Sequence, residues 1–149
     1  MKPRVLLVDA NAAVLLTLKA VLELNKFSVD AAASSADALR KLASGTYDLV
    51  ITETHLETER TGLKVMRAAR LQPYNPATAL LTADLPADGS WKSDAAQSLL
   101  VRPVGTAELL RQIRSLLARH RNSQILPVQR TGLRAQNGGM NRGTERKAS

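Results

Sequence analysis

The stretch that decides the fold is Asp48-Leu49-Val50-Ile51-Thr52-Glu53, a short apolar run that stops at an acidic side chain. A continuous apolar run of this length predicts a strand that is covered on both faces, as at the centre of a parallel sheet. Three further runs predict strands, at residues 4–8, 77–82 and 98–101. The residues at the ends of the four runs are Asp9, Glu53, Thr82 and Arg102. Because the carboxyl ends of parallel strands share one edge of a sheet, these four side chains are expected to meet in one cleft.

Helical periodicity fills the intervals between the strands. Asn11 is a good N-cap for a first helix, whose apolar face carries Leu15, Leu18 and Leu22. Ser34 and Asp37 form a capping pair for a second helix, which Gly45 ends. A third helix follows Gly62 and carries Leu63, Met66 and Leu71, a short fourth helix is expected around 91–97, and a fifth opens at Gly105 and Glu108. The apolar positions of that fifth helix are Leu109, Leu110, Ile113, Leu116 and Leu117.

Strict alternation of strands and helices predicts an α/β fold. With a second strand at 27–32, the chain has five βα units and is expected to form a flavodoxin-like, doubly wound (βα)5 domain. The predicted sheet is parallel and five-stranded, with strand order 2-1-3-4-5. Ligands of such sheets bind outside the carboxyl ends of the strands, beside the point where the strand order reverses.

Length and composition limit the class of protein. The chain has 149 residues, of which 44% are hydrophobic, and this is enough for one domain with a full core and an appendage. It has no cysteine, which excludes disulfide frameworks and thiolate metal sites. The apolar stretch near the N-terminus is too short for a signal peptide, and no run approaches the length of a membrane span. We expect a cytoplasmic protein.

The positive charge is concentrated at the end of the chain. Residues 1–120 carry 15 Lys and Arg against 12 Asp and Glu, which is +3, whereas residues 121–149 carry six against one, which is +5. Helical periodicity fades after His120, so we expect a domain at 1–121 and a basic, disordered tail at 122–149. Such a tail is either a solubilising end or a contact for a polyanion such as nucleic acid.

The run ends and their spacing resemble the receiver domain of two-component response regulators over roughly residues 3–120. In that family, two acids after the first strand and an acceptor aspartate after the third hold one Mg²⁺, and a phosphoryl group passes from a donor histidine to the aspartate. A hydroxyl after the fourth strand and a lysine after the fifth bind the phosphoryl oxygens. Most members belong to bacterial phosphorelay pathways.

The resemblance assigns a role to each residue of the predicted cleft. Asp9 matches the first acid, Ala10 replaces the second, and Glu53 stands where the acceptor aspartate is expected. Four residues fill the phosphoryl-binding positions: Thr82, Ala83, Arg102 and Pro103. Leu99 stands at the aromatic switch position. The acidic pocket is therefore degenerate, whereas the phosphoryl-binding side keeps its residue types with arginine in place of lysine.

These departures weaken phosphoryl chemistry. Ala10 supplies no oxygen, and Mg²⁺ depends on anionic oxygen ligands, so we expect weak or absent Mg²⁺ binding and no other cofactor. Glu53 places its carboxylate roughly 1.5 Å farther from the backbone than aspartate does. A misplacement of about 1 Å can reduce a rate on the order of 100-fold. We expect neither enzymatic activity nor normal aspartyl phosphorylation.

Two explanations of Glu53 stay open. In the first, its longer side chain imitates a phosphorylated acceptor and forms a fixed latch with Arg102, whose planar guanidinium matches a carboxylate in two hydrogen bonds. In the second, the site has drifted and Glu53 is a tolerated polar residue at a strand end. Leu99 argues against the usual aromatic switch, so an unconditional state is expected in either case.

Three functions follow from this sequence. The leading one is a stand-alone, phosphorylation-independent adaptor that binds a protein through the face of the fourth helix, fifth strand and fifth helix. The second is a nucleic-acid-associated protein that uses the Arg-rich tail. The third is a weakly functional phosphoacceptor, which requires Asp9 and Glu53 to hold Mg²⁺. Homodimerisation through the fourth-helix face is a further alternative.

Overall fold

The computed structural model describes residues 2–58, 61–82, 98–101 and 105–125. Along the chain the elements are β1 (Arg4–Val8), α1 (Ala12–Leu24), β2 (Ser28–Ala32), α2 (Ser35–Ser44), β3 (Leu49–Thr52), α3 (Thr61–Arg70), β4 (Ala77–Thr82), β5 (Ser98–Val101) and α4 (Thr106–Ile125). The last of these, α4, is the helix that the sequence predicts as the fifth. The helix expected around 91–97 lies outside the described residues.

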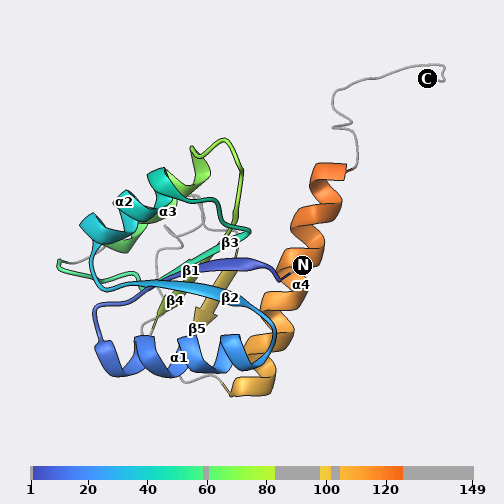
Figure 1. Ribbon diagram of the computed structural model, residues 1–149, viewed down its shortest axis with the longest axis horizontal. Coiled ribbons are helices and arrows are strands. Elements are labelled where there is room, and N and C mark those ends of the chain that lie inside the picture. The colour runs from blue at the N-terminus through green and yellow to red at the C-terminus, as the bar shows by residue number, and fades with distance from the viewer. Residues whose placement is uncertain (1, 59–60, 83–97, 102–104, 126–149) are drawn as a thin grey trace. The chain divides into compact units, whose positions relative to one another are not determined.

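The strands form one parallel sheet in the order β2-β1-β3-β4-β5, as predicted. Figure 1 shows α2 and α3 on one side of this sheet and α1 and α4 on the other. The flavodoxin-like α/β fold is therefore confirmed. With β1 between β2 and β3, the strand order reverses beside β1, so the carboxyl ends of β1 and β3 flank the crevice where ligands of such sheets bind.

Two apolar clusters, one on each side of the sheet, form the core. One joins α1 and α4 to the sheet and includes Leu15, Leu22, Leu109, Ile113 and Leu116. The other joins α2 and α3 to the sheet and includes Ala38, Leu42, Leu63, Met66 and Ala69. Since β1 and β3 contribute alternate residues to both clusters, the continuous apolar runs of these strands are explained by burial on both faces.

The local signals for helix ends are confirmed. The side chain of Asn11 accepts hydrogen bonds from the backbone N–H groups of Ala13 and Val14, and it thereby caps α1. Ser34 accepts from the N–H of Asp37 and caps α2, and Gly45 is the C-cap of that helix. These short-range contacts are encoded in the sequence within three residues of each helix end.

One expectation about an apolar residue needs correction. Leu71 was expected on the buried face of the third helix, but α3 ends at Arg70 and the Leu71 side chain is 84% exposed. Because Leu71 lies beyond the end of the helix, its side chain does not point in the direction that the helical repeat predicts. The last helix, α4, continues to Ile125, and the domain boundary expected at residue 121 stays a prediction.

The chain divides into two units, Met1–Leu117 and Ala118–Ser149. The sheet and the core described above belong to the first unit. Residues 126–149 lie outside the described part, so the disordered tail stays a prediction. Among the described residues, no helix combines the length and apolarity that crossing a membrane requires.

Candidate functional site

The carboxyl ends of β1 and β3 lie side by side and each leads into an acidic residue. Val8 pairs with Thr52 in the parallel register, and the N–H of Glu53 donates to the carbonyl of Val8 over 2.9 Å. Asp9 and Glu53, the next residues of the two strands, are 3% and 6% exposed. The sheet therefore brings the two predicted acids to the same crevice, and both side chains are buried there.

Asp9 supports the start of α1. One of its carboxylate oxygens, Oδ1, accepts a hydrogen bond from the backbone N–H of Asn11 over 2.8 Å, and Asn11 in turn caps the helix. Ala10, between them, is exposed and carries no side-chain oxygen. The carboxylate of Asp9 thus fixes the turn that joins β1 to α1, in addition to any role in the crevice.

The carboxylate of Glu53 turns onto the backbone of the loop that follows β3. Its Oε2 accepts a hydrogen bond from the N–H of Thr54 over 2.8 Å, and Thr54 is itself 4% exposed. The hydroxyl of Thr52 donates to the carbonyl of Glu53 over 3.1 Å. A buried carboxylate that accepts a backbone N–H is held in one orientation, because burial makes an unmade hydrogen bond costly.

Gly62 closes the other side of this loop. Its N–H donates to the carbonyl of Thr54 over 2.8 Å. A Cβ placed on Gly62 would lie 1.8 Å from the carbonyl oxygen of Glu53 and 2.9 Å from that of Thr54. Only glycine permits this approach, so the first turn of α3 packs directly against the backbone of the acidic residue.

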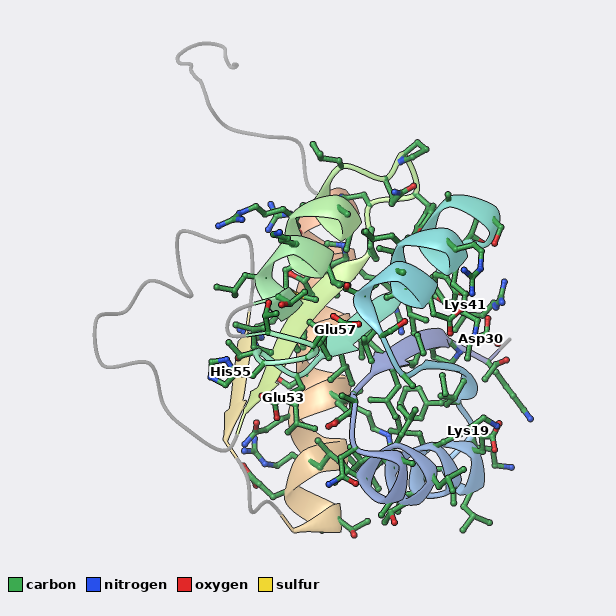
Figure 2. The ribbon with its side chains drawn as sticks, turned by 90° about the vertical axis from the view of Figure 1, so that its left-hand side faces the viewer. Lys19, Asp30, Lys41, Glu53, His55 and Glu57 are labelled. Carbon is green, nitrogen blue, oxygen red and sulfur yellow. The ribbon has the colours of Figure 1, made fainter. Side chains whose placement is uncertain are left out.

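Glu57 ties the same loop to α2. Its Oε2 accepts a hydrogen bond from the backbone N–H of Ser35, the first residue of α2, over 2.6 Å. Slight desolvation raises the pKa of the exposed Glu57 carboxyl, but the hydrogen bonds from Ser35 and from its own backbone outweigh this, so the pKa lies below its usual value. Figure 2 shows Glu53, His55 and Glu57 along this loop.

The phosphoryl-binding side of the predicted cleft is described in part. Thr82 ends β4 and pairs with Val101, the last residue of β5, so the strand ends converge as expected. Leu99 pairs with Leu80 in the same ladder. The remaining predicted residues of this side, Ala83, Arg102 and Pro103, lie outside the described residues, and the Glu53–Arg102 latch stays a prediction.

In the described part of the crevice, the donor set differs from the three-carboxylate Mg²⁺ site of the family that the sequence resembles, because residue 10 is alanine. In the ranges that the structure describes, no group of three or more His, Cys, Asp or Glu side chains could hold a metal. Among the described residues at the ends of β1 and β3, Asp9 and Glu53 carry the carboxylates, and each has one oxygen bound to a backbone N–H. Mg²⁺ prefers several oxygen ligands in near-octahedral array, and weak or absent Mg²⁺ binding stays a prediction.

Three contacts of the site were not foreseen from the sequence. The N–H of Thr54 as partner of Glu53, and that of Ser35 as partner of Glu57, depend on how the loop after β3 folds. Glu57 and Ser35 are 22 residues apart and no periodicity connects them. For Gly62 a signal was present, since a glycine inside a helix costs stability and usually marks a close approach of backbones.

A sequence profile of the response regulator receiver domain matches residues 5–114. The transcriptional regulatory protein PrrA of Mycobacterium tuberculosis is 30% identical over 119 residues, which are 78% of this chain and 51% of that protein. PrrA of Mycobacterium leprae matches to the same extent. The chain thus spans about half the length of the curated relatives it matches.

Solved structures share the fold. A CheY-like receiver domain protein from Methanospirillum hungatei superimposes with a TM-score of 0.76 at 21% identity, covering 83% of this chain and 99% of that one. The chemotaxis response regulator CheY4 of Vibrio cholerae gives a TM-score of 0.70 at 23% identity, covering 78% and 99%. A receiver domain of an HD domain-containing protein from Pseudomonas fluorescens gives 0.71 at 27% identity, covering 83% and 92%.

Proposed function

The chain belongs to the receiver-domain family of response regulators, and from that premise we propose that it is a signalling adaptor whose partner binding does not depend on its own phosphorylation. In this role, Glu53 replaces the phosphoacceptor aspartate and Ala10 replaces a metal-binding acid. The domain keeps the receiver fold but presents a single, unconditional state to a partner protein in two-component signalling.

The observation that carries the proposal is the hydrogen bond between Glu53 Oε2 and the N–H of Thr54 at 2.8 Å. An acceptor carboxylate must be able to attack a phosphoryl donor while a cation neutralises the charge of transfer. Here the carboxylate is buried, oriented by its own loop, and accompanied by Asp9 without a second acid at residue 10. These features favour a structural carboxylate over a nucleophile.

The position of the Glu53 carboxylate is also the basis for a fixed state. Glu53 places one negative charge at the end of β3, where a phosphorylated aspartate would carry about two. The predicted latch with Arg102 would use that charge to hold β5 and the start of α4 in one arrangement. The alternative is drift, in which the carboxylate matters only for the loop. In both cases, we expect the partner to bind the face that includes β5 and α4.

Restoring the acids tests the loss of phosphoryl chemistry. The wild-type chain and the variant Ala10→Asp/Glu53→Asp are incubated with acetyl phosphate and Mg²⁺ and examined by intact-mass spectrometry. We expect the double variant to gain one phosphoryl group and the wild type to gain none. A wild-type chain that is readily phosphorylated would reverse the proposal in favour of a working phosphoacceptor.

Removing the charge of Glu53 tests the fixed state. Glu53→Gln keeps the side-chain length and a carbonyl oxygen for the Thr54 N–H, and loses the negative charge. We expect amide resonances of β5 and α4 to shift in this variant and partner capture from the native host to weaken. Glu145→Gln, in the C-terminal tail outside the described residues, removes a charge elsewhere in the chain and serves as control. Unshifted β5 and α4 resonances favour drift.

The charge of +5 in residues 121–149 favours a second candidate, an association with nucleic acid. Such binding is expected to weaken steeply with salt, because bound basic residues release counterions from the phosphates. Duplex DNA binding of the full chain and of residues 1–125 is compared across a salt series. Equal binding by the two would remove the tail from this role.

A further inference from the structure

The outward face of α1 is an exposed apolar stripe. Leu16 and Leu24 are 68% and 83% exposed, and Ala20, midway between them, is exposed as well. Spacing of four residues places all three on one side of the helix. Leu15 and Leu22 point the opposite way, into the core between α1 and the sheet. The helix is therefore apolar on both sides, which is unusual for a helix with one face in water.

The stripe is bordered by small and paired side chains. Ala13 and Thr17 are exposed beside it and are uncharged. On the other flank, Lys19 donates to Glu23 over 2.8 Å. Figure 2 labels Lys19 on α1. Among the described residues, four large apolar side chains are exposed, and two of them lie on this one stripe. Exposed apolar groups that gather in this way mark interaction sites more often than single ones do.

We propose that α1 binds α1 of a second copy of this chain, antiparallel and around a two-fold axis at Ala20. The stripe is symmetric about that residue, because Leu16 lies four residues before it and Leu24 four residues after it, or about 6 Å in each direction. A two-fold axis at Ala20 sets Leu16 of each copy against Leu24 of the other. The small Ala20 side chains at the centre allow the helices to approach closely.

Charge complementarity favours a second copy as the occupant. Lys19 and Glu23 lie on the same flank of the stripe, on either side of the level of Ala20. The two-fold axis leaves the Lys19 and Glu23 flanks of the two helices on the same side of the interface. Because the helices are antiparallel, the two residues follow one another in opposite order along the two helices. Lys19 of each copy therefore comes near Glu23 of the other, so the Lys19–Glu23 ion pair that each copy already holds can extend across the interface. An isologous interface requires this kind of self-complementarity.

The size of the surface sets the strength of the association. One helix pair covers less than the roughly 800 Å² per partner of a standard stable interface. The dimer is accordingly weak and forms in a concentration-dependent way. It involves neither Glu53 nor the face of β5 and α4, so it goes beyond the adaptor role and leaves that face open to a partner.

Cysteine cross-linking tests the geometry directly, since the chain has no cysteine of its own. Helices packed about 9 Å apart, with Cα atoms about 2.3 Å from each axis, bring residues on the two-fold axis to roughly 4–5 Å, near the range of a disulfide. Under mild oxidation, Ala20→Cys is expected to form covalent dimers rapidly. Leu71→Cys is the control, because Leu71 is 84% exposed but follows α3, away from the stripe.

Sedimentation equilibrium over a concentration series tests the apolar contact. Leu16→Lys/Leu24→Lys is expected to sediment as a monomer at concentrations where wild type and Leu71→Lys associate. Both leucines are exposed, and circular dichroism checks that the variant keeps its fold. A wild-type chain that stays monomeric throughout, or a dimer that survives the double substitution, overturns the proposal. Cross-linking of Ala20→Cys that is no faster than that of Leu71→Cys also overturns the proposal. That result is expected if α1 binds a different protein and not a second copy of this chain.

Discussion

Gly62→Ala is the substitution for which the structure gives the sharpest expectation. The new Cβ would lie 1.8 Å from the carbonyl oxygen of Glu53, and real Cβ atoms essentially never come within 3.0 Å of a neighbour. The two groups must therefore separate by more than an ångström. Because the obstacle is backbone at the end of a central strand, no change of rotamer relieves the contact.

The magnitude follows from three contributions. Overpacking of a tight site costs about 1–3 kcal/mol. If α3 moves away, the hydrogen bond from Gly62 N–H to Thr54 is lost as well, which costs about 0.5–1.5 kcal/mol. Against this, alanine is favoured over glycine inside a helix by up to about 1 kcal/mol. We expect a net loss of roughly 1–3 kcal/mol in the free energy of unfolding.

Urea unfolding followed by circular dichroism measures this loss. The matched control is Gly105→Ala, since a Cβ on Gly105 meets nothing within 4 Å. Gly105 is the N-cap of α4, where alanine is less favoured than glycine, so the control is expected to lose less than about 1 kcal/mol. Amide resonances of Thr54 and its neighbours are also expected to shift in Gly62→Ala and to stay in place in the control. A Gly62→Ala chain as stable as wild type, with an unchanged Thr54 resonance, would refute the close approach.

The remaining predictions concern two other contacts. The pKa of Glu57 is lower in the folded than in the unfolded state. The Glu57 carboxylate therefore stabilises the fold above its unfolded-state pKa, and this stabilisation is lost as the pH falls through its folded-state pKa. Because the carboxylate is exposed, the free energies of unfolding of wild type and Glu57→Gln are expected to differ by less than about 1 kcal/mol at pH 7. In urea unfolding, this difference is expected to shrink between pH 7 and pH 3. Tyr47→Phe removes the 2.8 Å hydrogen bond to Asp30 and keeps the ring under Arg4, so it is expected to cost about 0.5–1.5 kcal/mol in the same assay. Burial, followed by the Asp30 hydrogen bond, raises the pKa of Tyr47, and burial also raises that of Tyr74. Ultraviolet titration should therefore show both tyrosines ionising above the usual pH, with Tyr47 the more resistant.

The fold is predictable because its signals are local and repeated. A run such as Leu49–Thr52 is apolar on both faces, and caps such as Asn11 and Ser34 act within three residues of a helix end. Leu71 shows the limit of periodicity, since a residue one position beyond the helix end no longer shares the helical face. The exposed Leu16 and Leu24 do not follow from the buried repeat of α1, because that repeat describes only the face that packs on the sheet.

The site is predictable at the level of which residues meet. The parallel pairing of β1 with β3 is enough to predict that Asp9 lies beside Glu53, whatever the conformation of the loops. The hydrogen-bond partners of the carboxylates were not predictable, because they are backbone N–H groups whose positions depend on the loop after β3. No residue type encodes that a backbone group of Ser35 will face Glu57, and only the folded chain determines it.

These backbone contacts bear on how a receiver fold can remain in one state. Asp9 fixes the start of α1, Glu57 the start of α2, and Gly62 the start of α3 against the backbone of Glu53. Three helix N-termini are thus tied to the crevice by contacts that require neither a metal ion nor a phosphoryl group. A change of charge at residue 53 is therefore expected to be felt first in the loop at Thr54 and at Gly62, before it reaches β5. If Glu53→Gln shifts the resonances of β5 and α4 and leaves those of Thr54 and Gly62 in place, the loop is not the route, and a direct contact across the crevice must carry the effect.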